Sequence, residues 1–139
     1  MNNMKYIDSN VFIFSFLTND DNSKLCQKIL EKVAEGRLQA CTCVLTWDEI
    51  TWIAKKVFGK EDSVTEGKKF FEFPYLSILN VTESIVRIAQ NLIEKYAIDP
   101  RDAIHAAAAI SSGCNKLISD DTDFDKIKEI KRISPKDFE

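Results

Sequence analysis

Apolar and polar positions along the chain predict short strands that alternate with helices. Short apolar runs are followed by stretches whose apolar side chains recur about every three or four positions, as on one face of a helix. The short runs predict strands at residues 4–7, 38–44, 75–80 and 116–119, and a further strand near the sheet edge at 129–133. The longer stretches predict helices at residues 10–17, 24–35, 47–58, 63–71, 83–97 and 101–112.

This alternation favours one fold class. Strands separated by helices of this length form β–α–β units, and we therefore expect a three-layer α/β/α fold with a mostly parallel central sheet of about four to five strands. The 139 residues contain no internal repeat, low-complexity tract or linker, and 45% of them are hydrophobic, which is enough for one core. The chain is accordingly predicted to form a single domain over residues 1–139.

The cysteines and the lone histidine argue against a zinc centre. Cys26, Cys41, Cys43 and Cys114 form no C-x-x-C pair, and His105 is the one histidine. We expect these thiols to be buried and reduced, which suits a cytoplasmic protein. The N-terminus does not resemble a signal peptide and no apolar run approaches the length of a membrane span, so no membrane association is expected.

The overall charge limits how the protein would hold a nucleic acid. The formal net charge is −3 and the pI is about 5.3. This acidity weighs against a binding mode that relies on a basic patch. It leaves room for a nuclease, because bound divalent cations neutralise carboxylates and present positive charge to a phosphate.

Two of the predicted strands run directly into acidic residues. Asp8 follows the first strand, and the segment 119–125 after the fourth strand contains Asp120, Asp121 and Asp123. Since functional sites of parallel sheets form at the carboxyl ends of strands, we expect these acids to share one rim of the sheet. Helix caps or solvated turns are the alternative explanation. That alternative is weaker for Asp8, which precedes an apolar helix, than for any single acid of the later segment.

Two further acids stand at predicted helix starts. Asp99 fits an N-cap followed by Pro100 at the first helical position, which leaves Asp102 without a structural explanation. The small apolar helix behind Asp102 is expected to pack closely on the sheet and to carry this acid to the same rim. Glu49 has capping-box spacing from Thr46, so a helix start and a site at the rim explain it equally well.

Carboxylates that converge without histidine or cysteine suit one kind of cofactor. Hard divalent cations prefer oxygen ligands, so the acids predict a site for Mg²⁺ or Mn²⁺. Such a metal can activate a water and stabilise charge on a phosphodiester without an acid–base histidine. His105 follows Asp102 by about one helical turn and is expected to be a packed or rim histidine, with contact to a substrate phosphate as the lesser alternative.

Four motifs follow one another over nearly the whole chain. They read Y-I-D-S-N-V-F, T-W-D-E-I-T-W, D-P-R-D-A-I-H-A-A-A-A and L-I-S-D-D-T-D-F. In this order and at these spacings they resemble the PIN domain, and most nearly the VapC-like toxins of toxin–antitoxin pairs. The resemblance implies a parallel sheet flanked by helices, a Mg²⁺- or Mn²⁺-dependent endoribonuclease acting on RNA, a homodimer and a neutralising antitoxin partner.

The same resemblance implies which residues carry the chemistry. It assigns catalysis to Asp8, Glu49, Asp102 and Asp121, metal binding to Asp8, Asp102, Asp121 and Asp123, and substrate contacts to Asn10 and Ser119. Ser119 stands where the family usually has threonine. Asp120, directly beside Asp121, leaves the fourth acid open between neighbours.

The residues alone leave two other functions open. A phosphohydrolase of the haloacid-dehalogenase type also has an aspartate after the first strand, but it needs a second aspartate two residues later, where this chain has Asn10. The other is a nucleic-acid-binding module without turnover, against which the intact set of acids argues.

A group of large aromatic residues bears on possible partner surfaces. We expect most of the group to lie in the core, with a dimer face or an antitoxin groove as the alternative. Its members are Trp52, Phe70, Phe71, Phe73 and Tyr75.

Overall fold

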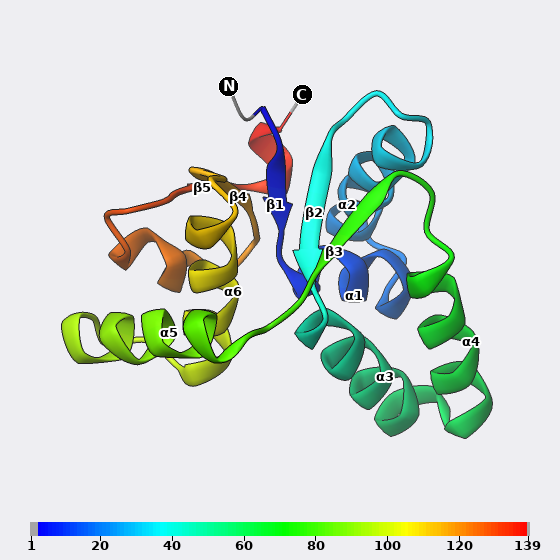
Figure 1. Cartoon of the computed structure of the whole chain (residues 1–139). Helices are drawn as coiled ribbons and strands as arrows, with labels where there is room; N and C mark the ends of the chain where they lie inside the picture. The colour runs from blue at the N-terminus through cyan, green and yellow to red at the C-terminus, as the bar shows by residue number, and fades with distance from the viewer. Residues whose placement is uncertain (1–2, 139) are drawn as a thin grey trace.

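A five-stranded sheet forms the centre of the fold (Figure 1). The computed structural model describes residues 3–138. The strands are β1 (Lys5–Ile7), β2 (Ala40–Cys43), β3 (Leu76–Leu79), β4 (Lys116–Ile118) and β5 (Lys131–Ile133). They lie in the order β3-β2-β1-β4-β5, and every neighbouring pair is parallel. The predicted parallel sheet is confirmed, with β5 at one edge.

Helices cover both faces of this sheet and complete the predicted three layers. On one face lie α1 (Ser9–Leu17), α2 (Asp21–Ala34), α3 (Leu45–Phe58), α4 (Lys60–Phe71) and the short 3₁₀ helix η2 (Pro135–Asp137). On the other lie α5 (Glu83–Lys95), α6 (Pro100–Ser111) and the 3₁₀ helix η1 (Thr122–Lys126). Figure 1 shows α5 and α6 on the side of the sheet opposite to α1, α2 and α3.

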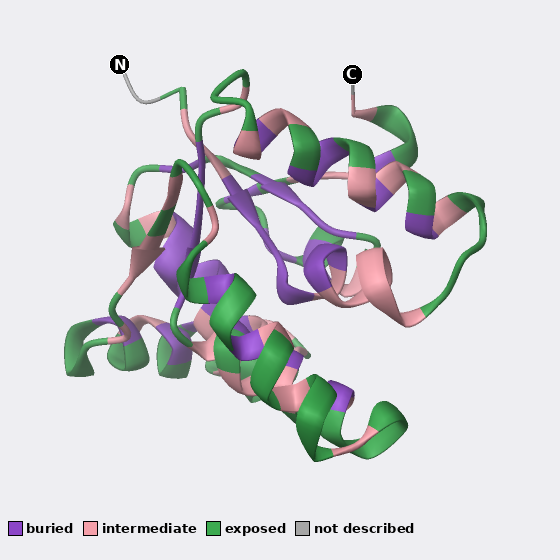
Figure 2. Ribbon diagram, turned by 90° about the vertical axis from the view of Figure 1, so that its right-hand side faces the viewer, coloured by how far each residue is buried: buried purple, intermediate pink, exposed green. Residues whose placement is uncertain are grey.

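The pleat of the strands divides the core into two clusters. Tyr6 of β1 packs on the side of α5 and α6, and the next residue, Ile7, packs on the side of α1 and α2. Leu117 and Ile118 of β4 divide in the same way. All four side chains are fully buried, and Figure 2 shows the central strands as buried segments. A sheet covered on both faces needs apolar residues at successive positions, which explains the short uninterrupted apolar runs.

The alanine-rich helix α6 packs closely against the sheet, as expected. Its contacts are with β2 and β4 and with α5. Ala103 and Ala106 to Ala109 are fully buried, and their small side chains let the helix backbone approach the strands. Helix α6 leads back to the start of β4, so its own first turn lies at the carboxyl ends of the strands (Figure 1).

Some element ends differ from those predicted. Helix α2 begins at Asp21, earlier than expected, because the side chain of Asp20 accepts a hydrogen bond from the backbone N–H of Ser23 at 2.9 Å. The 3₁₀ helix η1 was not predicted, since a single polar turn carries no apolar periodicity. Helix α3 begins at Leu45, ahead of the predicted start, with Val44 at the N-cap position.

The aromatic group is less buried than predicted. Phe70 is buried, but Trp52, Phe71 and Tyr75 expose 50%, 60% and 74% of their surface, so the core assignment is wrong for these three. Trp52 and Phe71 lie on the hairpin of α3 and α4, which projects from the sheet (Figure 1) and leaves these two rings outside. Tyr75 lies just before β3, with its ring against Gly36.

The other predictions of burial are confirmed. All four cysteines are free and buried, and Cys41 and Cys43 share one face of β2. Within residues 3–138, none of the helices combines the length and apolar character that crossing a membrane requires.

Candidate active site

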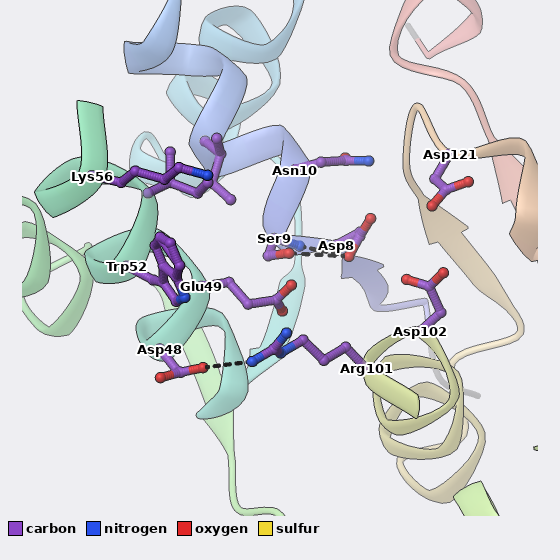
Figure 3. A pocket seen from close by; sticks show the side chains of 12 residues that line it. Asp8, Ser9, Asn10, Asp48, Glu49, Trp52, Lys56, Arg101, Asp102 and Asp121 are labelled. Atoms are coloured by element: carbon purple, nitrogen blue, oxygen red, sulfur yellow. Dashed lines mark hydrogen bonds and ion pairs between the residues drawn. The ribbon is translucent and has the colours of Figure 1, made fainter. Parts of the chain in front are cut away.

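A cavity of about 410 Å³ lies where β1, α3, α6 and the loop after β4 meet (Figure 3). The strand order reverses direction at β1, which pairs with both β2 and β4, and sites of parallel sheets form at such a point. All four acids predicted to be catalytic line the cavity. The polar and charged lining consists of Asp8, Ser9, Asn10, Asp48, Glu49, Lys56, Arg101, Asp102 and Asp121.

Asp8 is held rigidly at the floor of this cavity. Only 4% of its surface is exposed. Its Oδ1 accepts a hydrogen bond from the backbone N–H of Ser9 at 2.8 Å, and its Oδ2 accepts one from the hydroxyl of Ser119 at 2.7 Å. Burial raises the pKa of Asp8 despite these bonds. The residue caps α1, as the structural alternative proposed, and the same cap aims its carboxylate into the cavity.

Ser119 and Asn10 connect Asp8 to the acidic loop. The Ser119 hydroxyl is fully buried and accepts hydrogen bonds from Asn10 Nδ2 at 3.1 Å and from the backbone N–H of Asp121 at 3.0 Å. Asn10 lines the cavity, while its Oδ1 accepts from the backbone N–H of Asp120 at 3.4 Å. The two residues predicted to contact substrate thus hold the loop after β4 against the start of α1.

Three aspartates gather beside the cavity, and two of them, Asp102 and Asp121, line it. Asp102, Asp121 and Asp123 each offer a carboxylate oxygen, and these oxygens lie within 4.8 Å of one another. Asp121 Oδ1 also accepts a hydrogen bond from the backbone N–H of Asp123 at 2.9 Å, which starts η1. Asp120 is exposed and lies outside this cluster, so the geometry separates it from its neighbour Asp121.

The electrostatics of Asp102 indicate that this cluster fits a cation. Burial raises the pKa of Asp102 to about 7, with further contributions from the charges of Asp121 and Asp8. Asp99 occupies the N-cap position of α6 and Pro100 follows in the first turn, as predicted, but the Asp99 side chain makes no capping hydrogen bond. Oxygen ligands of like charge at such short separation are what a hard divalent ion would neutralise.

Glu49 lies on the opposite wall, and its contacts decide between its two explanations. Thr46 and Glu49 do not form the predicted capping box. The Thr46 hydroxyl instead shares a hydrogen bond of 2.6 Å with the hydroxyl of Thr42, and no side chain caps the start of α3 among the described residues. Glu49 Oε1 lies 2.6 Å from Nε2 of His105 and the side chain lines the cavity. The carboxylate therefore belongs to the rim and not to the helix start.

The sequence did not predict which residues His105 contacts. His105 is fully buried, which fits the packed histidine that we expected, and it joins three elements beneath the cavity. Nε2 lies between Glu49 and Asp8, and Nδ1 lies 2.7 Å from the hydroxyl of Tyr6. Burial lowers the pKa of His105, but hydrogen bonds to Cys43 and Glu49 and the charge of Asp8 raise it well above the ordinary value. The spacing of one turn from Asp102 was the only signal for it.

Comparisons with known proteins bear on the family and the fold. A profile of the PIN domain matches residues 5–130. A toxin–antitoxin complex from Klebsiella pneumoniae superposes with a TM-score of 0.69 at 23% identity, covering 94% of this chain and 97% of that one. FitAcB from Neisseria gonorrhoeae has a TM-score of 0.73 at 16% identity, covering 97% of this chain and 100% of that one.

A third solved structure shares the fold at lower identity. VapC20 from Mycobacterium tuberculosis, described as a sarcin–ricin loop cleaving toxin, has a TM-score of 0.72 at 12% identity and covers 88% of this chain and 92% of that one. Comparison with curated protein sequences gave no match. At these identities the solved structures establish the fold, and the profile match establishes the family.

Proposed function

Because the chain belongs to the PIN domain family, we propose that it is a metal-dependent endoribonuclease and the toxin of a VapBC-type toxin–antitoxin pair, acting in the cytoplasm. The observation that carries the proposal is the cluster of Asp102, Asp121 and Asp123 oxygens within 4.8 Å, beside the buried Asp8. An oxygen-only set of this kind suits Mg²⁺ or Mn²⁺.

The metal supplies the part of the chemistry that the side chains lack. A bound Mg²⁺ or Mn²⁺ would stabilise negative charge on the phosphodiester and make an attacking water easier to deprotonate. Asp102, Asp121 and Asp123 would hold it, with Asp8 facing the same space. The raised pKa of Asp102 supports this assignment, because a carboxyl surrounded by like charges gains most from a cation.

The protein's own groups position the reactants. Ser9 and Ser119 fix both oxygens of Asp8, so this carboxylate does not rotate away from the cavity. Glu49, on the opposite wall, is held by His105 and presents its carboxylate to the space between the walls. In the proposed reaction Glu49 accepts the proton of the attacking water. Preorganised carboxylates need little rearrangement when charge develops on the phosphate.

An antitoxin partner is part of the proposal. The similar structure from Klebsiella pneumoniae is a toxin–antitoxin complex, and this similarity supports an antitoxin as the partner of the present chain. We also propose that the chain forms a homodimer in solution. A monomeric mass by light scattering at micromolar concentration would refute the dimer.

The other candidate functions have less support. A haloacid-dehalogenase-type enzyme needs a second aspartate where this chain has Asn10, and that side chain here bonds to Ser119. A binding module without turnover would not need a cluster of carboxylates, because their negative charges repel one another and destabilise the fold. A phosphorylated Asp8 trapped during turnover would favour the former, and failure to bind any divalent ion would favour the latter.

The experiment follows cleavage of cellular RNA by the purified protein with Mg²⁺ or Mn²⁺. We expect cleavage that stops when the metal is chelated and is lost in Asp8→Asn, a variant of nearly the same shape. Normal cleavage by a folded Asp8→Asn protein would overturn the proposed function.

A further inference from the structure

An exposed tryptophan forms one wall of the same cavity. Trp52 lies on α3, about one turn after Glu49, and 50% of its surface is exposed. Figure 3 shows it on the α3 side of the cavity, across from Asp102 and Asp121. Among residues 3–138, Trp52 stacks on no other aromatic ring, whereas Trp47 stacks on Phe71.

Trp52 also borders a second hollow. This hollow measures about 600 Å³, within the range of about 300–1,000 Å³ found for ligand pockets. It adjoins the acidic cavity along α3, because Asp48, Trp52 and Lys56 line both. Its remaining lining residues are Trp47, Thr51, Lys55 and Ser63. Room for a flat group therefore exists beside the ring, next to the carboxylates.

Cations accompany the ring. Lys56 Nζ lies 5.0 Å from the centre of the Trp52 ring, and Lys56 lines the acidic cavity. Arg101 reaches the same wall from α6, where it pairs with Asp48 at 3.8 Å (Figure 3). An aromatic face with neighbouring cations matches the two parts of a nucleotide, since the base stacks on the ring and the phosphate binds the cations.

We propose that Trp52 is a stacking platform for an unpaired nucleobase of single-stranded RNA, with Lys56 binding the backbone phosphate beside it. The inference rests on the proposed function and deepens it. An RNA strand whose scissile phosphate lies at the Asp102–Asp121 wall continues across the cavity towards α3, where its next nucleotides meet Trp52. Lys56 beside the ring favours RNA over a purely apolar protein segment, because its charge attracts a backbone phosphate.

The test measures binding by fluorescence anisotropy in the Asp8→Asn background, with Mg²⁺ present and cleavage blocked. The probes are a labelled uridine homopolymer and an abasic oligomer of the same length. We expect the base-bearing RNA to bind more tightly than the abasic one. Trp52→Ala is expected to weaken binding of the homopolymer by roughly 5- to 150-fold and to remove the discrimination between the probes.

Matched variants separate stacking from loss of folding. Trp52→Phe keeps an aromatic face and is expected to retain most of the preference for the base-bearing probe. Phe58→Ala removes another exposed ring of α3, outside the lining of both hollows, and is expected to bind as the parent does. Lys56→Ala is expected to weaken binding of both probes by the same factor. It is also expected to lower the salt dependence of binding by about one released counterion.

The platform and the proposed function fail in different ways. Equal binding of the two probes by the parent, or unchanged homopolymer binding in Trp52→Ala, overturns the platform and leaves that face to a protein partner. No binding of the homopolymer also overturns it. Absence of metal-dependent cleavage of cellular RNA by the wild-type protein overturns the proposed function instead.

Discussion

The Nε2 atom of His105 lies 2.6 Å from Oε1 of Glu49 and 3.7 Å from Oδ1 of Asp8. A carboxylate can only accept hydrogen bonds, so with a carboxylate at Glu49 the donor in this contact is the N–H of His105 Nε2. The hydroxyl of Tyr6, 2.7 Å from Nδ1, engages the other ring nitrogen. A histidine on α6 thereby holds an acid of α3 beside the acid that follows β1.

Removing this histidine is expected to cost both stability and activity. His105→Ala leaves a cavity and deprives Glu49 and Tyr6 of a buried partner, so we expect the free energy of unfolding in urea to fall by about 2–4 kcal/mol. His105→Gln can still donate to Glu49 and is expected to recover part of the cleavage rate. An unfolding midpoint for His105→Ala equal to that of the wild type would contradict the account.

Stability of the metal-free protein is expected to fall as the pH rises from about 5 to about 8. The pKa of Asp102 is about 7 in the folded chain and about 3.9 in an unfolded one, so between these values the folded state holds the extra proton. Its contribution is complete below the unfolded pKa and is lost as the pH rises through the folded pKa. The raised pKa values of Asp8 and His105 act in the same direction.

Melting temperatures in chelator across this pH range provide the check. Asp102→Asn is expected to flatten the profile and to stabilise the metal-free protein at about pH 8 by about 1–2 kcal/mol, after allowance for solvent screening. Asp120→Asn, at an exposed neighbour of the cluster, is expected to keep the wild-type slope. If melting temperature fell with pH equally in the two variants, Asp102 would not be the source of the pH dependence.

Divalent ions are expected to bind at the three-aspartate cluster. Calorimetric titration with Mn²⁺ is expected to show binding that weakens by at least about tenfold in Asp102→Asn and in Asp121→Asn, the scale found even for groups that only orient ligands. Near pH 6, binding is expected to release a proton, because Asp102 must ionise. Asp120→Asn again serves as the control, and equal weakening there would place the ion elsewhere.

The acidic loop depends on one buried ring. Phe124 of η1 is fully buried in the core on the α6 side, directly after Asp123 and three residues after Asp121. Phe124→Ala is expected to lower the free energy of unfolding by about 3–5 kcal/mol and to weaken Mn²⁺ binding, since the loop loses its anchor. Phe124→Leu keeps most of the volume and is expected to cost less in both measurements. A stable Phe124→Ala protein with normal Mn²⁺ binding would show that the loop is held by other contacts.

The sequence predicted the sheet and the positions of Asp8 and Asp102 because both follow from local pattern. Buried parallel strands need continuous apolar runs, and acids directly after them must lie at one rim. The link between Glu49 and His105 could not be predicted, since it depends on how α3 and α6 are placed across the sheet. The same holds for Trp52, whose exposure reflects the projection of the α3–α4 hairpin and not its own sequence neighbours.

RNA cleavage by variants of two adjacent aspartates shows whether catalysis depends on the acid cluster or only on the acidity of the loop. The measured quantity is the rate at which the purified protein cleaves cellular RNA in Mn²⁺, compared between Asp121→Asn and Asp120→Asn. We expect a fall on the order of 100-fold or more for Asp121→Asn, equivalent to roughly 3 kcal/mol of transition-state stabilisation, and a rate near that of the wild type for Asp120→Asn. Equal rates for the two variants, or cleavage that survives chelation of the metal, would contradict this expectation.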